Sequence, residues 1–167
     1  NAETGALVFS ATPAATSTTN LQVTGMADSM PGSVATLDSD GDGKTDRIYA
    51  GDTGGNIWRM DLPNATKSDW RVFKFASLGS DSTLADDRRF FTQPIVVRTI
   101  NKEVTRSVVG GNTVYSYQDR PFDAVLIGSG DRNRPSSEST VRNGYFMLRD
   151  YDVMPRATNA TARDPIL

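Results

Sequence analysis

The sequence predicts an all-β fold of antiparallel strands, and three observations lead to this prediction. Apolar residues occur in short runs bounded by Gly, Pro, Asp and Asn, which is the pattern of strands joined by turns. Long helical periodicity is hard to find along the chain. The composition, with 14 Gly, 8 Pro and 37% hydrophobic residues in 167 positions, favours short strands, many turns and a modest core.

The expected strands follow one another along most of the chain. Two of them, 56–62 and 70–75, alternate apolar and polar residues, as a strand with one buried face does. The other expected strands are the apolar runs at 6–9, 32–37, 47–51, 94–98, 106–109, 114–117, 124–128 and 145–149. The small polar residues 10–19 predict a loop, residues 84–91 predict one short helix, and residues 154–167 predict an irregular linker.

A weak internal repeat indicates how the strands are grouped. Residues 46–51 and 123–128 each contain an Asp, four strand residues and a Gly. The flanking strands match as well, 34–37 with 95–97 and 57–61 with 146–150. Each unit is therefore a meander with a further strand to follow, and repeated four-stranded meanders are the pattern of β-propeller blades. An ordinary antiparallel sandwich is the alternative.

Composition and charge exclude several classes of function. Eighteen Lys and Arg against 20 Asp and Glu give a net charge of −2, which argues against a nucleic-acid-binding protein. The chain has no His and no Cys, so a thiol nucleophile, a Ser-His-Asp triad, a His/Cys metal site and a disulfide are all excluded. We expect a protein that is not an enzyme and holds any metal through oxygen. No apolar run reaches the roughly 18 residues of a transmembrane segment.

The segment 38–46, Asp-Ser-Asp-Gly-Asp-Gly-Lys-Thr-Asp, carries the strongest chemical signal in the chain. Alternation places three carboxylates on the inside of one curl, and Gly43 permits a sharp bend that aims the next carbonyl inward. Such a loop supplies most of the six to eight oxygens that Ca²⁺ needs. The expected ligands are the carboxylates of Asp38, Asp40, Asp42 and Asp46 and the main-chain carbonyl of Lys44.

This loop resembles that of an EF-hand without being one. Positions one, three, five, seven and nine of the EF-hand loop are represented, but Tyr49 stands where the twelfth-position Glu belongs, and strands flank the loop. Ca²⁺ is the expected ion, since Mg²⁺ demands stricter octahedral geometry. A solvated acidic turn is the alternative. The ion has two possible roles, a structural clip between strands or a sensor.

The run from Thr36 to Leu62, which combines the Asp loop with the Gly-Asn-Ile-Trp-Arg strand, resembles the calcium-loop blade of PilY1-type proteins. These are the type IV pilus biogenesis factors and tip adhesins of Gram-negative bacteria. Residues 93–95 and 125–132 resemble the next blade, and 4–9 resembles the last strand of the blade before. The resemblance implies that residues 1–153 are a fragment of the C-terminal modified β-propeller. Its parts are a blade end at 1–10, a calcium-loop blade at about 32–76 and a second blade at about 92–151.

The resemblance also implies a role, partners and a location. It carries over the same five calcium ligands, and it links calcium occupancy to pilus extension and retraction, twitching motility and surface attachment. The implied partners are pilus proteins (minor pilins or the pilus tip) or host and surface ligands, together with the remaining blades of the parent propeller. The implied location of the exported parent protein is the cell surface, at the pilus tip or the outer membrane. An integrin-like (FG-GAP) binding module with a purely structural ion is the alternative. A quinoprotein-type propeller enzyme is disfavoured because no catalytic constellation can be assigned.

Overall fold

The computed structural model describes residues 1–135 and 140–156. Antiparallel strands dominate this part of the chain, and its only helical elements are the 3₁₀ helices η1 (Lys67–Asp69) and η2 (Leu84–Asp86). The all-β prediction is confirmed, and the short helix expected at 84–91 is a single 3₁₀ turn. Within the described ranges no helix has the length and hydropathy that crossing a membrane requires. Of the expected linker, residues 157–167 lie outside the described residues.

The first sheet is a four-stranded meander. It consists of β3 (Ala35–Leu37), β4 (Arg47–Gly51), β5 (Asn56–Asp61) and β6 (Arg71–Ser77), each antiparallel to the next. The turn between β4 and β5 is organised by the buried carboxylate of Asp52. It accepts hydrogen bonds from the main-chain N–H of Asn56 at 2.8 Å and from Trp58 Nε1 at 2.6 Å. These bonds fix the turn and hold the Trp58 side chain in the sheet.

The second sheet contains β7 (Ile95–Val109), β8 (Asn112–Gly128) and β9 (Tyr145–Asp150), in that order. The strands expected at 106–109 and 114–117 are not separate elements but the outer parts of β7 and β8. Gly110 and Gly111, with φ of 58° and 83°, form the two-residue connection between these strands. Positive φ at both positions is the requirement of the tight hairpin turn that leaves strand pairing uninterrupted, so the two strands stay paired up to the tip.

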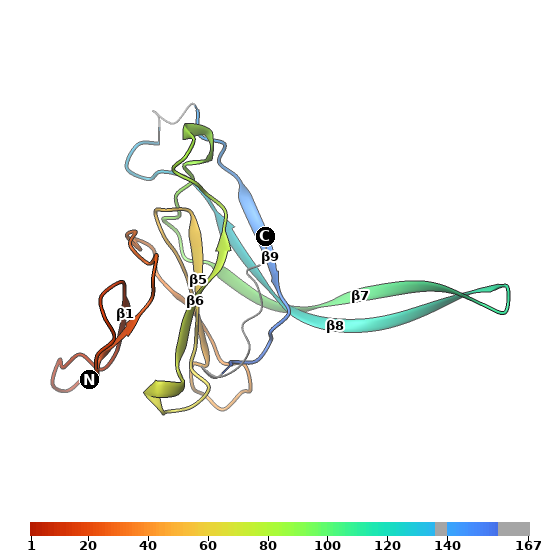
Figure 1. Cartoon of the computed structure of the whole chain (residues 1–167), viewed down its shortest axis with the longest axis horizontal. Coiled ribbons are helices and arrows are strands. Elements are labelled where there is room, and N and C mark those ends of the chain that lie inside the picture. Colours follow the sequence, from red (N-terminus) through yellow and green to blue (C-terminus); the bar gives the residue numbers. More distant parts are fainter. Residues whose placement is uncertain (136–139, 157–167) are drawn as a thin grey trace.

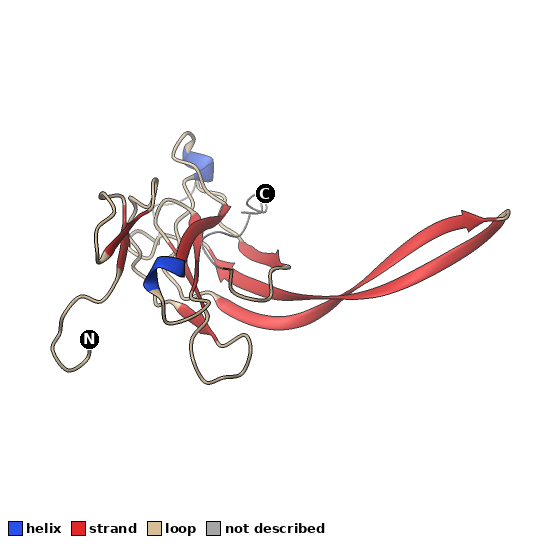
Figure 2. Cartoon of the chain, turned by 60° about the horizontal axis from the view of Figure 1, so that its bottom comes forward, coloured by secondary structure: helices blue, strands red, loops and turns tan. Residues whose placement is uncertain are grey.

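Most of the β7–β8 hairpin extends away from the sheets as an arm (Figures 1 and 2). The last residue of β9, Asp150, lies opposite Asp123, which in turn pairs with Arg98. We call residues 99–122, beyond this point, the arm; there only β7 and β8 pair. Exposed apolar side chains line one face of the arm, namely those of Ile100, Val104, Val108, Tyr115 and Tyr117.

The N-terminal region differs from the sequence prediction. Residues 6–9 form no strand, and the expected loop at 10–19 contains β1 (Ser10–Thr12), which pairs in parallel with β2 (Asn20–Gln22). Residues 6–9 lie apart from the core, and the side chain of Leu7 is 64% exposed, so its burial does not stabilise a strand there. Asn20 instead ties the two short strands together, because its side-chain oxygen accepts a hydrogen bond from Thr12 Oγ1 at 2.9 Å.

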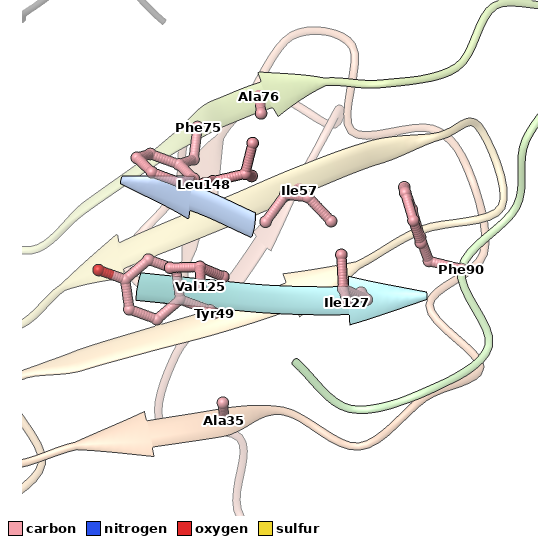
Figure 3. Packing of buried hydrophobic residues seen from close by; sticks show 9 residues of the cluster. All are labelled: Ala35, Tyr49, Ile57, Phe75, Ala76, Phe90, Val125, Ile127 and Leu148. Atoms are coloured by element: carbon pink, nitrogen blue, oxygen red, sulfur yellow. The ribbon is translucent and has the colours of Figure 1, made fainter. Parts of the chain in front are cut away.

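The repeat seen in the sequence corresponds to matching strands in the two sheets. β3, β4 and β5 have the same order and directions as β7, β8 and β9, whereas no described strand of the second sheet corresponds to β6. The two sheets face each other across the core, with Phe90 at one end (Figure 3). The buried core residues are Ala35, Tyr49, Ile57, Phe75, Ala76, Phe90, Val125, Ile127 and Leu148. The division into blades at 32–76 and 92–151 stays a prediction.

Candidate metal centre

The aspartate-rich loop 38–46 connects β3 to β4, so the sheet fixes both of its ends. Leu37 lies opposite Arg47 in the ladder. The main-chain N–H of Asp46 donates to the carbonyl of Leu37 at 2.9 Å, and the carbonyl of Asp46 accepts from the N–H of Leu62 at 2.7 Å. The loop therefore closes on a rigid base, and its nine residues curl outward from there.

The structure brings three of the predicted ligands together. Carboxylate oxygens of Asp38, Asp40 and Asp42 lie within 4.8 Å of one another, and all three residues are exposed. Asp38 organises the curl, since its two oxygens accept from the main-chain N–H groups of Gly41 at 2.7 Å and Gly43 at 2.8 Å. Gly43 adopts a φ of 84°, which is the sharp bend expected at this position.

Hydrogen bonds and one ion pair favour the charged forms of two of these carboxylates, those of Asp38 and Asp42. The N–H groups of Gly43 and Gly41 lower the pKa of Asp38, and the Lys44 side chain lowers the pKa of Asp42. The ammonium Nζ of Lys44 lies 2.6 Å from Asp42 Oδ2 and is itself exposed. Lys44 thus acts as a monovalent counter-ion in the loop, and the three ionised oxygen donors fit a hard cation.

Asp46 occupies a different environment from the other three aspartates. It is 8% exposed, and its Oδ2 accepts a hydrogen bond from the main-chain N–H of Ser39 at 2.6 Å. It lies outside the group of carboxylates gathered within 4.8 Å. Asp46 therefore closes the loop from its inner side, and its role as a calcium ligand stays a prediction, as does that of the Lys44 carbonyl.

Directly beneath the loop lies a buried ionic network that the sequence analysis missed. Its centre is Arg47, the first residue of β4, whose side chain is fully buried. The guanidinium donates to five acceptors, which are Ser39 Oγ, Tyr49 Oη, a carboxylate oxygen of Asp123, and the carbonyls of Asp152 and Val153. Arg47 thus joins the first sheet to β8 and to the segment that follows β9.

A second arginine extends this network. Arg59 on β5 donates to both oxygens of Asp61, at 2.6 and 3.0 Å, and to Asp150 at the end of β9. Tyr49 Oη donates to Asp150 Oδ2 at 2.7 Å, and burial strongly raises the pKa of the phenol. Burial also raises the pKa of Asp61 despite its contact with Arg59. The network is an ionic layer within an otherwise apolar contact between the sheets.

A sequence signal for this network exists in the repeat. Asp61 and Asp150 hold equivalent positions at the ends of matched strands, and Arg47 alternates with the apolar residues that face the core. A charged residue at an inward position of a strand needs a buried partner. The matched acids supply that partner for Arg59, which lies two residues before Asp61.

Comparison with known families gives this arrangement its context. The family model of the PilY1 beta-propeller domain matches residues 4–147, which is most of the chain. The chain belongs to the PilY1 β-propeller family. The predicted resemblance and the predicted incomplete propeller are thereby confirmed, and the two facing sheets are parts of a PilY1 propeller.

A curated relative agrees with this assignment. The chain is 33% identical over 95 residues to a protein described as "Type IV pilus biogenesis factor PilY1 homolog" from Xylella fastidiosa (strain Temecula1 / ATCC 700964). The matched region is 56% of this chain and 6% of the relative, so the chain corresponds to a small part of that protein's length. No solved structure matches the chain.

Proposed function

We propose that this chain is the calcium-binding part of a type IV pilus biogenesis and adhesion protein. Membership of the PilY1 β-propeller family and the printed description of the Xylella relative support the pilus role. The observation that carries the calcium role is the group of three aspartate carboxylates within 4.8 Å on a loop anchored at both ends by the sheet. The family match also favours this function over an integrin-like module.

The loop residues have distinct tasks in calcium binding. Asp38, Asp40 and Asp42 supply three carboxylates at the mouth of the loop, while Asp46 and the carbonyl of Lys44 complete the set from its inner side. A bound Ca²⁺ supplies two positive charges that offset the repulsion among these carboxylates. The Lys44 ammonium then leaves Asp42, because a divalent ion takes over the role of counter-ion.

The biological role follows from placing this loop in a pilus protein. Calcium occupancy regulates pilus extension and retraction, and with them twitching motility and surface attachment. The partners are pilus proteins or surface ligands, and the site of action is the cell surface or the pilus tip. Neither catalysis nor nucleic-acid binding is part of the proposal, in line with the charge balance of −2 and the absence of His and Cys from the sequence.

Isothermal titration with CaCl₂ tests the calcium role. We expect the wild-type chain to bind calcium, and Asp40→Ala and Asp46→Ala to lose the calcium heat while their far-UV circular dichroism spectra keep the β signal. Asp81→Ala, at an exposed aspartate outside the loop, is the matched control and should bind as the wild type does. Equal calcium heats in all four proteins would refute the site.

Twitching assays on the parent bacterium test the pilus role. Asp40→Ala in the chromosomal copy should reduce twitching zones and surface attachment, and Asp81→Ala should not. The parent protein should be present at equal levels in both strains, as judged by immunoblotting. Normal twitching in a strain whose protein has lost calcium binding would show that the ion has only a structural role.

A further inference from the structure

Ser39 connects the calcium loop to the buried ionic network through three different atoms. Its main-chain N–H donates to Asp46 at 2.6 Å, and its hydroxyl accepts from Arg47 Nε at 2.8 Å. Its carbonyl accepts from Arg98 Nη1 at 3.3 Å. Ser39 also lies between Asp38 and Asp40 in sequence, so any displacement of these two carboxylates moves the Ser39 backbone.

Arg98 stands at the base of the arm. It pairs with Asp123 across the β7–β8 ladder, at the position where β9 ends, and every residue beyond it belongs to the two-stranded arm. Its guanidinium donates to both oxygens of Asp123, at 2.9 and 3.1 Å, and to the carbonyl of Val153 at 2.6 Å. Arg98 therefore contacts β8, the segment after β9 and the calcium loop at once.

The arm is held at its base, by this junction and by Phe122 and Arg120, which both pack on the ring of Tyr151. A two-stranded hairpin without a covering layer is only marginally stable in water. The apolar face of the arm, from Ile100 to Tyr117, is exposed along its length. Contacts at the base thus decide how firmly the arm is held against the sheets.

We propose that calcium in loop 38–46 sets the order and direction of the β7–β8 arm through Ser39 and Arg98. This inference rests on the proposed calcium function. With Asp38 and Asp40 bound to one ion, the Ser39 carbonyl between them is fixed where Arg98 donates to it. Without the ion, repulsion among the carboxylates loosens the curl, and the 3.3 Å bond, already long for an N–H···O contact, is lost.

The position of the arm in the repeat is consistent with this coupling. In the first sheet the calcium loop connects β3 to β4, and at the corresponding place in the second sheet β7 and β8 continue outward as the arm. Arg98 and Ser39 are the residues at which the two connections meet. The loop therefore acts on the arm at its base only, through Arg98, and does not need to touch the rest of the arm.

Amide hydrogen exchange by mass spectrometry tests the coupling on the whole chain, with calcium or with a chelator. In the wild type, calcium should slow exchange at 99–103 and 118–122 by at least about fivefold, the lower end of allosteric coupling factors. In Arg98→Gln the slowing of exchange by calcium at these residues should fall below about twofold. Arg106→Gln, at an exposed arginine on the same strand, is the matched control and should behave as the wild type.

Isothermal titration with CaCl₂ on the same three proteins separates the two proposals. All three should bind calcium with the same stoichiometry, since Arg98 is not a calcium ligand, and because coupling is reciprocal Arg98→Gln should bind it more weakly than the other two. Calcium heat in the wild type with unchanged exchange at the base of the arm would overturn the coupling and leave the calcium site in place. Equal protection in Arg98→Gln and wild type would overturn the route through Arg98. No calcium heat in the wild type would overturn both.

Discussion

Replacing Arg47 by methionine removes the cation at the centre of the ionic network. Deleting one partner of a buried ion pair costs about 3–5 kcal/mol, because the other charge stays buried. Asp123 keeps Arg98 as a partner, and the carbonyls of Asp152 and Val153 keep a donor in Arg59 and Arg98 respectively. The expected loss therefore lies at the lower end, about 3 kcal/mol, or about 6–12 °C in Tm for a chain of this size.

Urea denaturation followed by tryptophan fluorescence measures this loss, since Trp58 is buried and hydrogen-bonded within the first sheet. Arg106→Met is the matched control on the exposed arm and should change the free energy of unfolding by less than about 0.5 kcal/mol. A double-mutant cycle of Arg47→Met with Asp123→Asn should give a coupling energy of at least about 1 kcal/mol. If Arg47→Met were within about 1 kcal/mol of the control, the network would not stabilise the contact between the sheets.

Three further changes test other parts of the structure. Tyr49→Phe removes the hydroxyl that donates to Asp150, and urea denaturation should show a loss of about 1–3 kcal/mol; an unchanged midpoint would contradict this. Gly111→Val places a β-branched residue at a φ of 83°, at a cost of about 1–3 kcal/mol, so amide exchange should accelerate in the arm but not in β5. Burial alone raises the pKa of Asp123, but hydrogen bonds and charge from Arg98 and Arg47 lower it overall. The stability that the charged Asp123 contributes is therefore complete above its unfolded-state pKa of about 4, and it is lost as the pH falls through the lower folded-state pKa. The stability difference between wild type and Asp123→Asn should therefore narrow in acid, and a constant difference would show that Asp123 is not held charged.

Local patterns in the sequence are enough to predict the sheets. Alternation and turn residues place β4, β5 and β9 within one or two residues of their observed bounds, and the repeat matches strands that prove equivalent in the two sheets. The same signals fail for the arm, because apolar runs at 106–109 and 114–117 have the same pattern whether they lie in a sheet or project into solvent. Only the pairing of Arg98 with Asp123, where β9 stops, distinguishes the two cases.

The candidate site is predictable to a similar extent. Alternating aspartates bring Asp38, Asp40 and Asp42 together because the spacing is local. The position of Asp46 is set by its hydrogen bond to Ser39 and by main-chain pairing with Leu37 and Leu62, which the spacing of the aspartates alone does not show. Local sequence patterns do not predict the ionic network either, because Arg47 and Asp123 are 76 residues apart in the chain.

The length of the arm makes it a lever. Residues 99–109 span about 36 Å at about 3.3 Å per residue, with Arg98 at the pivot. A tilt of about 5° at the pivot displaces the tip at Gly110 by about 3 Å, roughly the length of a hydrogen bond. Movements at the pivot too small to disturb the sheets are thus magnified into displacements that a molecule touching the tip can detect.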